Sequence, residues 1–216
     1  MQTIIFATQN AGKVREIKDM LHPRYDVLTM REAGVELSIE ETGTTFLDNA
    51  LIKARSVSDA LAEKGQDSIV IADDSGIEID FFDRKPGIYS SRWLGEDTPY
   101  EIKNQIVLDR MKEVPDDKRT ARYVCALVAV VPARLIPGDF SAAAKAQELS
   151  VVETVEGLIA HEPKGNGGFG YDPIFLIPEA GQTFAEMTAE EKHAISHRGK
   201  ALRALIQLFQ SHHLLD

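Results

Sequence analysis

The sequence of 216 residues has little of several things, and each shortage excludes a class of protein. Cys125 is the only cysteine, which excludes a disulfide framework and a CxxC metal site and favours a reducing compartment, the cytoplasm. No apolar run approaches the roughly 20 residues that a membrane-spanning helix needs, so we expect no membrane partner. The first residues, MQTIIFATQN, lack the basic region and the long apolar stretch of a signal peptide.

Basic residues are also few: 24 Lys and Arg stand against 34 Asp and Glu, a formal net charge of −10. Such a charge repels long polyanions, so a nucleic-acid-binding module is the weakest interpretation and no nucleic acid is expected as a partner. Small phosphorylated ligands are compatible with it, because a few lysines in one cleft can dominate the local field. The hydrophobic share of 44% and the charged share of 27% are those of an ordinary folded domain with a core.

Strand and helix patterns alternate along the chain. Apolar or alternating runs predict strands at residues 3–7, 68–72, 77–81, 120–131, 149–159 and 174–177. Helical spacing predicts helices at residues 14–21, 45–64 and 98–114, and a capping box at 188–191 opens a last helical region. Residues 132–148, with two prolines and a glycine, are typical of an exposed excursion. The alternation predicts a single α/β domain with a mixed sheet.

The first candidate site is the turn TQNAGK between the first strand and the first helix. It comprises Thr8, Gln9, Asn10, Ala11, Gly12 and Lys13. A helix N-terminus with added side-chain hydrogen bonds and one lysine suits an anion. The alternative is an ordinary turn in which Asn10 caps the helix, and the turn is not a Walker A loop. Taken alone, this segment favours the ordinary turn.

The second candidate is the pair of acidic segments IADDSG and EETG. Asp73 and Asp74 follow a buried strand and point to opposite faces, so they are expected to do different jobs. Glu40 and Glu41 precede the helix that carries Asn49 and Lys53. Carboxylates that converge from separate segments suit Mg²⁺ together with substrate phosphate oxygens. The alternative makes DDSG a β-turn and EETG a capping loop.

The third candidate is the glycine-rich segment GNGGFGYD. Phe169 and Tyr171 supply flat surfaces, Gly170 frees the backbone, and Asp172 can accept hydrogen bonds from ring N–H groups. Such a segment is typical of a pocket for a planar heterocycle. The alternative is a glycine-rich hairpin loop.

The fourth candidate is the segment EEKHAISHRGKAL. Its histidines, His193 and His197, have the spacing of a helical metal pair, but no third ligand accompanies them. Lys192, His197 and Arg198 are better suited to donate to a phosphate or to the carbonyl of a base. Trp93 is either a second aromatic wall of that pocket or an ordinary core residue.

Together the segments resemble the inosine/xanthosine triphosphate pyrophosphatase family. The matching pieces are FATQNAGKVREI, EETGTTFLDNALIKA, IADDSGIEID, PGIYSSRW, GFGYDPIF and EMTAEEKHAISHRGKAL, which span residues 5–202. Gln9 departs from the glycine that the family commonly has in its phosphate-binding turn. The resemblance implies an elongated, two-lobed α/β fold with a long curved mixed sheet, flanking helices and a central cleft, usually as a homodimer.

The resemblance also implies an activity and its residues. The substrate would be a deaminated purine nucleoside triphosphate (ITP, dITP or XTP), cleaved with Mg²⁺ to the monophosphate and pyrophosphate. The turn from Thr8 to Lys13 and Lys53 would hold the triphosphate, with Ser75 helping to fix the substrate. Asp74 would activate water and would share Mg²⁺ with Glu40 or Glu41. The nucleobase pocket would comprise Phe169, Gly170, Tyr171, Asp172, Lys192, His197 and Arg198.

Two other readings use the same residues. A related pyrophosphatase could act on pyrimidine or modified nucleotides, because phosphate handling can be shared. A non-catalytic nucleotide sensor could use the same pocket, but a sensor does not need a water-activating carboxylate such as Asp74.

Overall fold

The computed structural model describes residues 3–95, 97–136 and 145–214. Its helices are α1 (Ala11–Leu21), α2 (Phe46–Glu63), α3 (Tyr100–Arg110), α4 (Ala189–Ile195) and α5 (His197–Ser211). Its strands are β1 (Thr3–Phe6), β2 (Asp26–Thr29), β3 (Ile69–Ile79), β4 (Lys85–Pro86), β5 (Thr120–Val131), β6 (Gln147–Ile159), β7 (Phe175–Ile177) and β8 (Gln182–Thr183). Short 3₁₀ turns occur at Asp80–Phe82, Gly87–Tyr89, Asp116–Lys118, Ala133–Leu135 and Asp172–Ile174.

The strands form one open mixed sheet in the order β2-β1-β3-β5-β6-β7-β8, with β4 paired to β3 off this path. β1 is parallel to both β2 and β3, whereas β4, β7 and β8 pair antiparallel with their neighbours. This arrangement confirms the predicted α/β class with a mixed sheet. In the described residues, no helix is long and apolar enough to cross a membrane.

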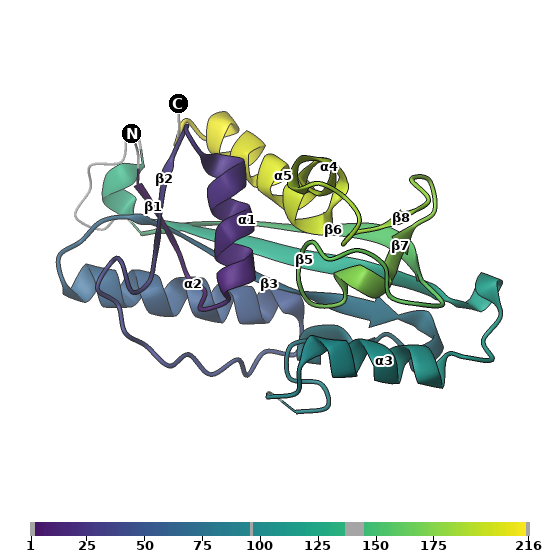
Figure 1. Ribbon diagram of the computed structural model, residues 1–216. Coiled ribbons are helices and arrows are strands. Elements are labelled where there is room, and N and C mark those ends of the chain that lie inside the picture. Colours follow the sequence, from purple (N-terminus) through teal and green to yellow (C-terminus); the bar gives the residue numbers. More distant parts are fainter. Residues whose placement is uncertain (1–2, 96, 137–144, 215–216) are drawn as a thin grey trace. The chain divides into compact units, whose positions relative to one another are not determined.

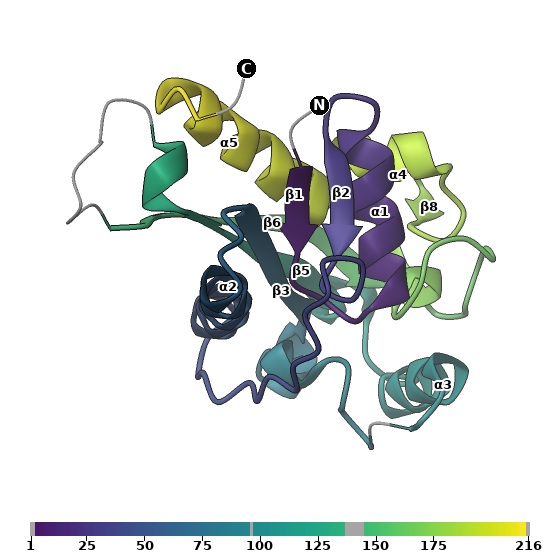
Figure 2. The ribbon, with the colours of Figure 1, turned by 90° about the vertical axis from the view of Figure 1, so that its left-hand side faces the viewer.

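The chain divides into two compact units. Unit 1 comprises residues 1–74, 126–152 and 201–216, and unit 2 comprises residues 75–125 and 153–200. In unit 1, α1 and α2 lie on opposite faces of the β1–β3 strands (Figure 2). Unit 2 contains α3, α4 and the strands β4, β7 and β8 (Figure 1). Its core of mainly apolar side chains includes Ile77, Val107 and Phe175. Trp93 packs against that core, which supports its reading as a core residue.

The predicted turn at DDSG is wrong, because β3 runs without interruption from Ile69 to Ile79. The local sequence favours a turn, but tertiary partners override it: Asp73 and Asp74 both meet lysines within unit 1. Further along the strand, the backbone N–H of Ile77 donates to Ser90 Oγ at 2.9 Å. A Cβ at Gly76 would lie 2.3 Å from the same oxygen, so only glycine allows the strand to pass Ser90.

The bounds of the other predicted elements differ less from those of the structure. The helix expected at 98–114 is the shorter α3, because Pro99 precedes its first residue and Met111 ends it. The capping box is present: Thr188 accepts from the backbone of Glu191, whose side chain accepts from Thr188. The last helical region is two helices, since Ser196 is extended between α4 and α5. His193 and His197 therefore do not share one continuous helix, which removes the basis of a helical metal pair. Residues 137–144 of the predicted excursion lie outside the described residues.

Candidate functional site

The TQNAGK turn of unit 1 is built as an N-cap. Asn10 is extended, and its side-chain oxygen accepts from the backbone N–H of Lys13 at 3.1 Å. Thr8 Oγ1 accepts from the backbone N–H of Asn10 at 3.2 Å. Ala11 and Gly12 thus occupy the first helical turn, where backbone N–H groups have no intrahelical acceptor and favour an anion. The capping reading is confirmed, and it leaves the turn able to receive a phosphate.

Lys13 connects this turn to the acidic strand. Its ammonium lies 2.7 Å from Asp73, a side chain that is fully buried. β1 pairs with β2 on one side and with β3 on the other. The order of successive strands across the sheet therefore reverses between β1 and β3. Ligands of open α/β sheets commonly bind beside such a point, at the carboxyl ends of the strands.

Asp74 is the centre of a second cluster in unit 1. Its carboxylate accepts from Lys53 Nζ at 3.1 Å and from Asn49 Nδ2 at 3.2 Å. The same lysine lies 2.6 Å from Glu41, so two carboxylates face one ammonium. Glu40 is exposed and makes no hydrogen bond or ion pair within the described residues, so the structure brings Glu41, and not Glu40, to Asp74.

Asn49 is the residue of this cluster to which the sequence analysis gave no role. It is fully buried, and its side-chain oxygen accepts from the backbone N–H of Gly43 at 2.9 Å while its amide donates to Asp74. A Cβ on Gly43 would lie 2.6 Å from that oxygen. Asn49 therefore joins the EETG segment to the acidic strand. A polar residue on the apolar face of a predicted helix was the sequence signal that could have found it.

Burial sets the electrostatics of the cluster. Burial raises the pKa of Asp74 above its usual value, although Lys53 and Lys13 oppose that shift. Burial alone would lower the pKa of Lys53. The charges of Asp74, Asp73 and Glu41 outweigh this effect, so the pKa of the ammonium is raised. A carboxylate with a raised pKa is a better base than an exposed one, so Asp74 is suited to take a proton from water.

Among the described residues, no three His, Cys, Asp or Glu side chains are arranged to hold a metal ion. Mg²⁺, however, is commonly bound through one or two carboxylates, with water and substrate phosphates filling the remaining positions. Asp74 and Glu41 already converge on one cation, the Lys53 ammonium, and fit that smaller donor set.

In unit 2, Asp172 organises the glycine-rich loop. One of its oxygens accepts from the backbone N–H of Phe169 at 2.8 Å and pairs with Lys192 at 2.6 Å. The other accepts from the Tyr123 hydroxyl at 3.3 Å. Gly168 has φ +68°, and a Cβ there would lie 2.1 Å from the carboxylate. Asp172 thus receives several donors from the protein itself and shapes the loop, while its role of accepting a hydrogen bond from a base stays a prediction.

Two other residues predicted for the base pocket, Lys192 and Arg198, lie over the ring of Phe169. The Lys192 ammonium lies 5.1 Å and the Arg198 guanidinium 5.7 Å from the centre of its ring. Arg198 also donates to Ser75 Oγ at 2.8 Å, which places Ser75 in this cluster. Gly170, at φ +72°, accepts through its carbonyl from Asn104 of α3.

Tyr123 of β5 is the main member of this cluster that sequence reasoning missed. Its ring stacks on His197 with centroids 4.6 Å apart and planes 5° from parallel. Burial, and secondarily the charge of Asp172, raises the pKa of its hydroxyl well above the usual value, so it stays a donor at neutral pH. Tyr171 instead turns its hydroxyl to the backbone carbonyl of Ser90, at 3.0 Å, and packs in the core. Nothing in the run TARYVCALVAVV distinguishes Tyr123 from a core aromatic residue.

Comparison with known proteins gives a consistent result. The model of the Ham1 family matches residues 4–208. A dITP/XTP pyrophosphatase of Bacillus subtilis is 43% identical over 213 residues, 98% of each chain. One of Escherichia coli is 43% identical over 212 residues, covering 98% of this chain and all of that one. A solved HAM1 protein from Coxiella burnetii superposes with a TM-score of 0.79 at 34% identity, over 98% of this chain and 100% of that one.

These matches cover nearly the whole chain, including both clusters described above. They confirm the family resemblance drawn from the six sequence segments. The chain belongs to the Ham1 family.

Proposed function

We propose that this protein hydrolyses deaminated purine nucleoside triphosphates (ITP, dITP and XTP) to the monophosphate and pyrophosphate, which removes them from the nucleotide pool. The observation that carries the proposal is the near full-length identity, about 43%, to relatives named dITP/XTP pyrophosphatase. The cluster of unit 1 has lysines and carboxylates, which suit a triphosphate. The cluster of unit 2 has aromatic rings and hydrogen-bond donors, which suit a base.

The residues of unit 1 would carry the chemical step. The first turn of α1, Lys13 and Lys53 bind the triphosphate and neutralise its charge. Asp74, held by Asn49, orients a water for in-line attack on the α-phosphorus and accepts its proton. The bond from that phosphorus to the bridging oxygen breaks, and pyrophosphate leaves. Positioning and charge neutralisation supply most of the acceleration.

Magnesium dependence is part of the proposal. Asp74 and Glu41 are the residues that would hold Mg²⁺, together with phosphate oxygens of the substrate. Bound there, the ion would neutralise charge on the phosphates and lower the pKa of an attacking water.

The residues of unit 2 would select the base. Hypoxanthine and xanthine carry a 6-oxo group that Arg198 can donate to, whereas adenine leaves that donor unpaired. Sites built on hydrogen bonds reject such mismatches by roughly 10⁴–10⁵. Guanine would be refused at position 2, because its amino group buried without an acceptor costs about 1–3 kcal/mol.

The test is incubation with Mg²⁺ and ITP, with ATP and GTP in parallel, and chromatographic identification of the products. IMP and pyrophosphate from ITP, with ATP and GTP nearly untouched, are the expected result. IDP and phosphate would overturn the α-phosphorus attack. No turnover of any purine would favour a pyrimidine-nucleotide enzyme or a sensor, which a binding assay with ITP separates.

The homodimer implied by the resemblance and the cytoplasmic location favoured by the single cysteine also belong to this proposal. Light scattering after size exclusion tests the first, since a dimer has twice the mass of the chain. Fractionation of the source cells tests the second.

A further inference from the structure

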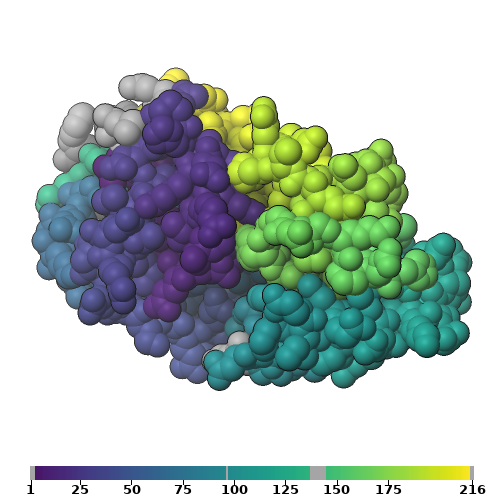
Figure 3. Space-filling model, in the orientation of Figure 1, coloured from purple at the N-terminus to yellow at the C-terminus, as the bar shows by residue number. Residues whose placement is uncertain are grey.

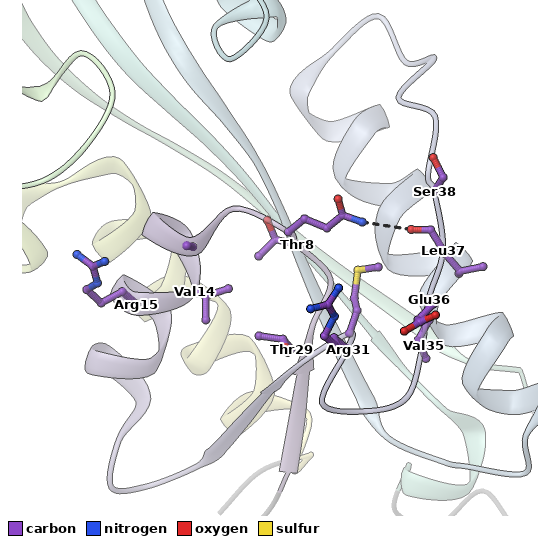
Figure 4. A pocket seen from close by; sticks show the side chains of 12 residues that line it. Thr8, Val14, Arg15, Thr29, Arg31, Val35, Glu36, Leu37 and Ser38 are labelled. Carbon is purple, nitrogen blue, oxygen red and sulfur yellow. Dashed lines mark hydrogen bonds between the residues drawn. The ribbon is translucent and has the colours of Figure 1, made fainter. Parts of the chain in front are cut away.

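Unit 1 has a cavity of about 810 Å³ beside the ends of β1 and β2. Three segments line it: the end of β1 with the first turns of α1, the end of β2, and residues 30–38, which face them (Figure 4). α1 and the segment after β2 lie at the surface of the unit, in purple in Figure 3, so the cavity is accessible to a small molecule.

The cavity is distinct from the proposed catalytic cluster. None of the ion-paired residues of that cluster lines it, neither the lysines Lys13 and Lys53 nor the carboxylates Asp73 and Asp74. Those residues gather where β1 adjoins β3, whereas the cavity lies where β1 adjoins β2. The two places share only the turn between them, through Thr8, Gln9 and Ala11.

The charged side chains of the cavity favour an anion. Arg15 of α1 and Arg31 after β2 are both exposed, and within the described ranges neither side chain forms a hydrogen bond or ion pair (Figure 4). Glu36 is the one carboxylate of the lining, which leaves the cavity with an excess of positive charge. That excess is unusual in a chain with a formal net charge of −10. Guanidinium groups bind carboxylate, sulfonate and phosphate oxygens in bidentate geometry.

The remaining walls favour an occupant with an apolar body. Val14, Met30, Val35 and Leu37 contribute to the lining, and Met30 and Val35 are buried. A ligand site is typically of this kind, with apolar walls and a few polar groups that fix orientation. The volume is within the range of about 300–1,000 Å³ that is usual for small-molecule pockets.

Gln9 links the cavity to the proposed phosphate turn. Its side-chain amide donates to the backbone carbonyl of Leu37 at 3.3 Å, across the lining (Figure 4). The residue thus tethers the turn to the segment that faces it. An occupant that contacts Gln9 would act on the backbone that receives the triphosphate.

We propose that this cavity, between α1 and residues 30–38, is a second binding site for a small organic anion with an apolar body. The site shares only Thr8, Gln9 and Ala11 with the proposed catalytic residues, and it does not depend on the activity proposed above.

The test uses anilinonaphthalene sulfonate, a fluorescent anion with an apolar body, titrated into the protein without nucleotide. Arg15→Ala combined with Arg31→Ala should weaken binding roughly tenfold or more, because two charge-assisted contacts are lost. Glu36→Gln should tighten it about two- to fivefold by removing a like charge. The matched control is Arg55→Ala with Arg134→Ala, which removes the same charge from exposed arginines of unit 1 that do not line the cavity. That control should leave the affinity unchanged.

Three outcomes would overturn the proposal. Equal weakening by the control pair would mean that only the net charge of the protein matters. No change in either the arginine or the Glu36 variant would mean that the probe binds elsewhere. Displacement of the probe by IMP and pyrophosphate at saturating concentrations would make the cavity part of the substrate site. Thermal melts of each variant confirm that it is folded before titration.

Discussion

The two units use ion pairs in opposite ways. In unit 1 the side chains of Lys53 and Glu41 are 11% and 23% exposed, and the ammonium is shared between two carboxylates. In unit 2 the side chains of Lys192 and Asp172 are 6% and 3% exposed, and the ammonium also lies over two phenylalanine rings. A shared pair that water can reach can exchange partners with a phosphate, whereas an enclosed pair fixes a loop. The difference separates a cluster built for chemistry from one built for recognition.

The largest expected effect comes from replacing Asp74, the proposed general base of the cluster in unit 1. Asp74→Asn removes the proton acceptor but keeps the shape, so turnover of ITP should fall by roughly 10²–10⁴. Calorimetric titration with ITP should still show binding, because the α1 turn and the base pocket are intact. Turnover within a few-fold of the unchanged protein would show that Asp74 is not the base.

The pH dependence of kcat/KM tests the same role of Asp74. A base must be ionised, so kcat/KM should fall as the pH drops through the pKa of Asp74. Burial raises that pKa in the metal-free protein, whereas Mg²⁺ held by Asp74 would lower it, so the acid limb should move to lower pH as the Mg²⁺ concentration rises. Rates measured against ITP across this limb, with stability checked at each pH, give the value.

Asn49 tests whether the first cluster depends on positioning. Asn49→Asp keeps the shape but replaces the amide donor with a second carboxylate beside Asp74. Turnover should fall about 10–100-fold, as for other residues that orient an active group. A like charge raises the pKa of a neighbour, so the acid limb should also move to higher pH. A drop in turnover without that movement would indicate a structural defect only, which a thermal melt would show.

Arg198 tests the second cluster through selectivity. Arg198→Ala removes the donor proposed for the 6-oxo group, and the preference for ITP over ATP should fall by roughly 10–100-fold. Arg198→Lys keeps the charge but not the planar fork, so it should retain part of the preference. The ratio of kcat/KM for the two substrates is the measurement. An unchanged ratio in the alanine variant would remove Arg198 from base recognition.

The contrast between the units also explains what the sequence could predict. Apolar periodicity found the main helices and strands, and motif residues reached both clusters, because these signals are local. The DDSG turn was wrong because Lys13 and Lys53, distant in sequence, supply the partners that keep the carboxylates in a strand. Asn49 and Tyr123 were missed for a related reason: a buried asparagine or tyrosine acquires its role only from the residues that folding brings to it.

The smallest expected effect is in the enclosed cluster, at Tyr123. Tyr123→Phe removes the hydroxyl that donates to Asp172 at 3.3 Å but keeps the ring that stacks on His197. Because Lys192 and the Phe169 N–H still hold the carboxylate, unfolding free energy should fall by about 0.5–1.5 kcal/mol. In a chain of this length that corresponds to a melting temperature lower by roughly 1–6 °C. Kinetics separates the roles of the two units: KM for ITP should rise a few-fold while kcat holds. A fall in kcat alone would mean that the loop contributes to the chemical step as well as to recognition.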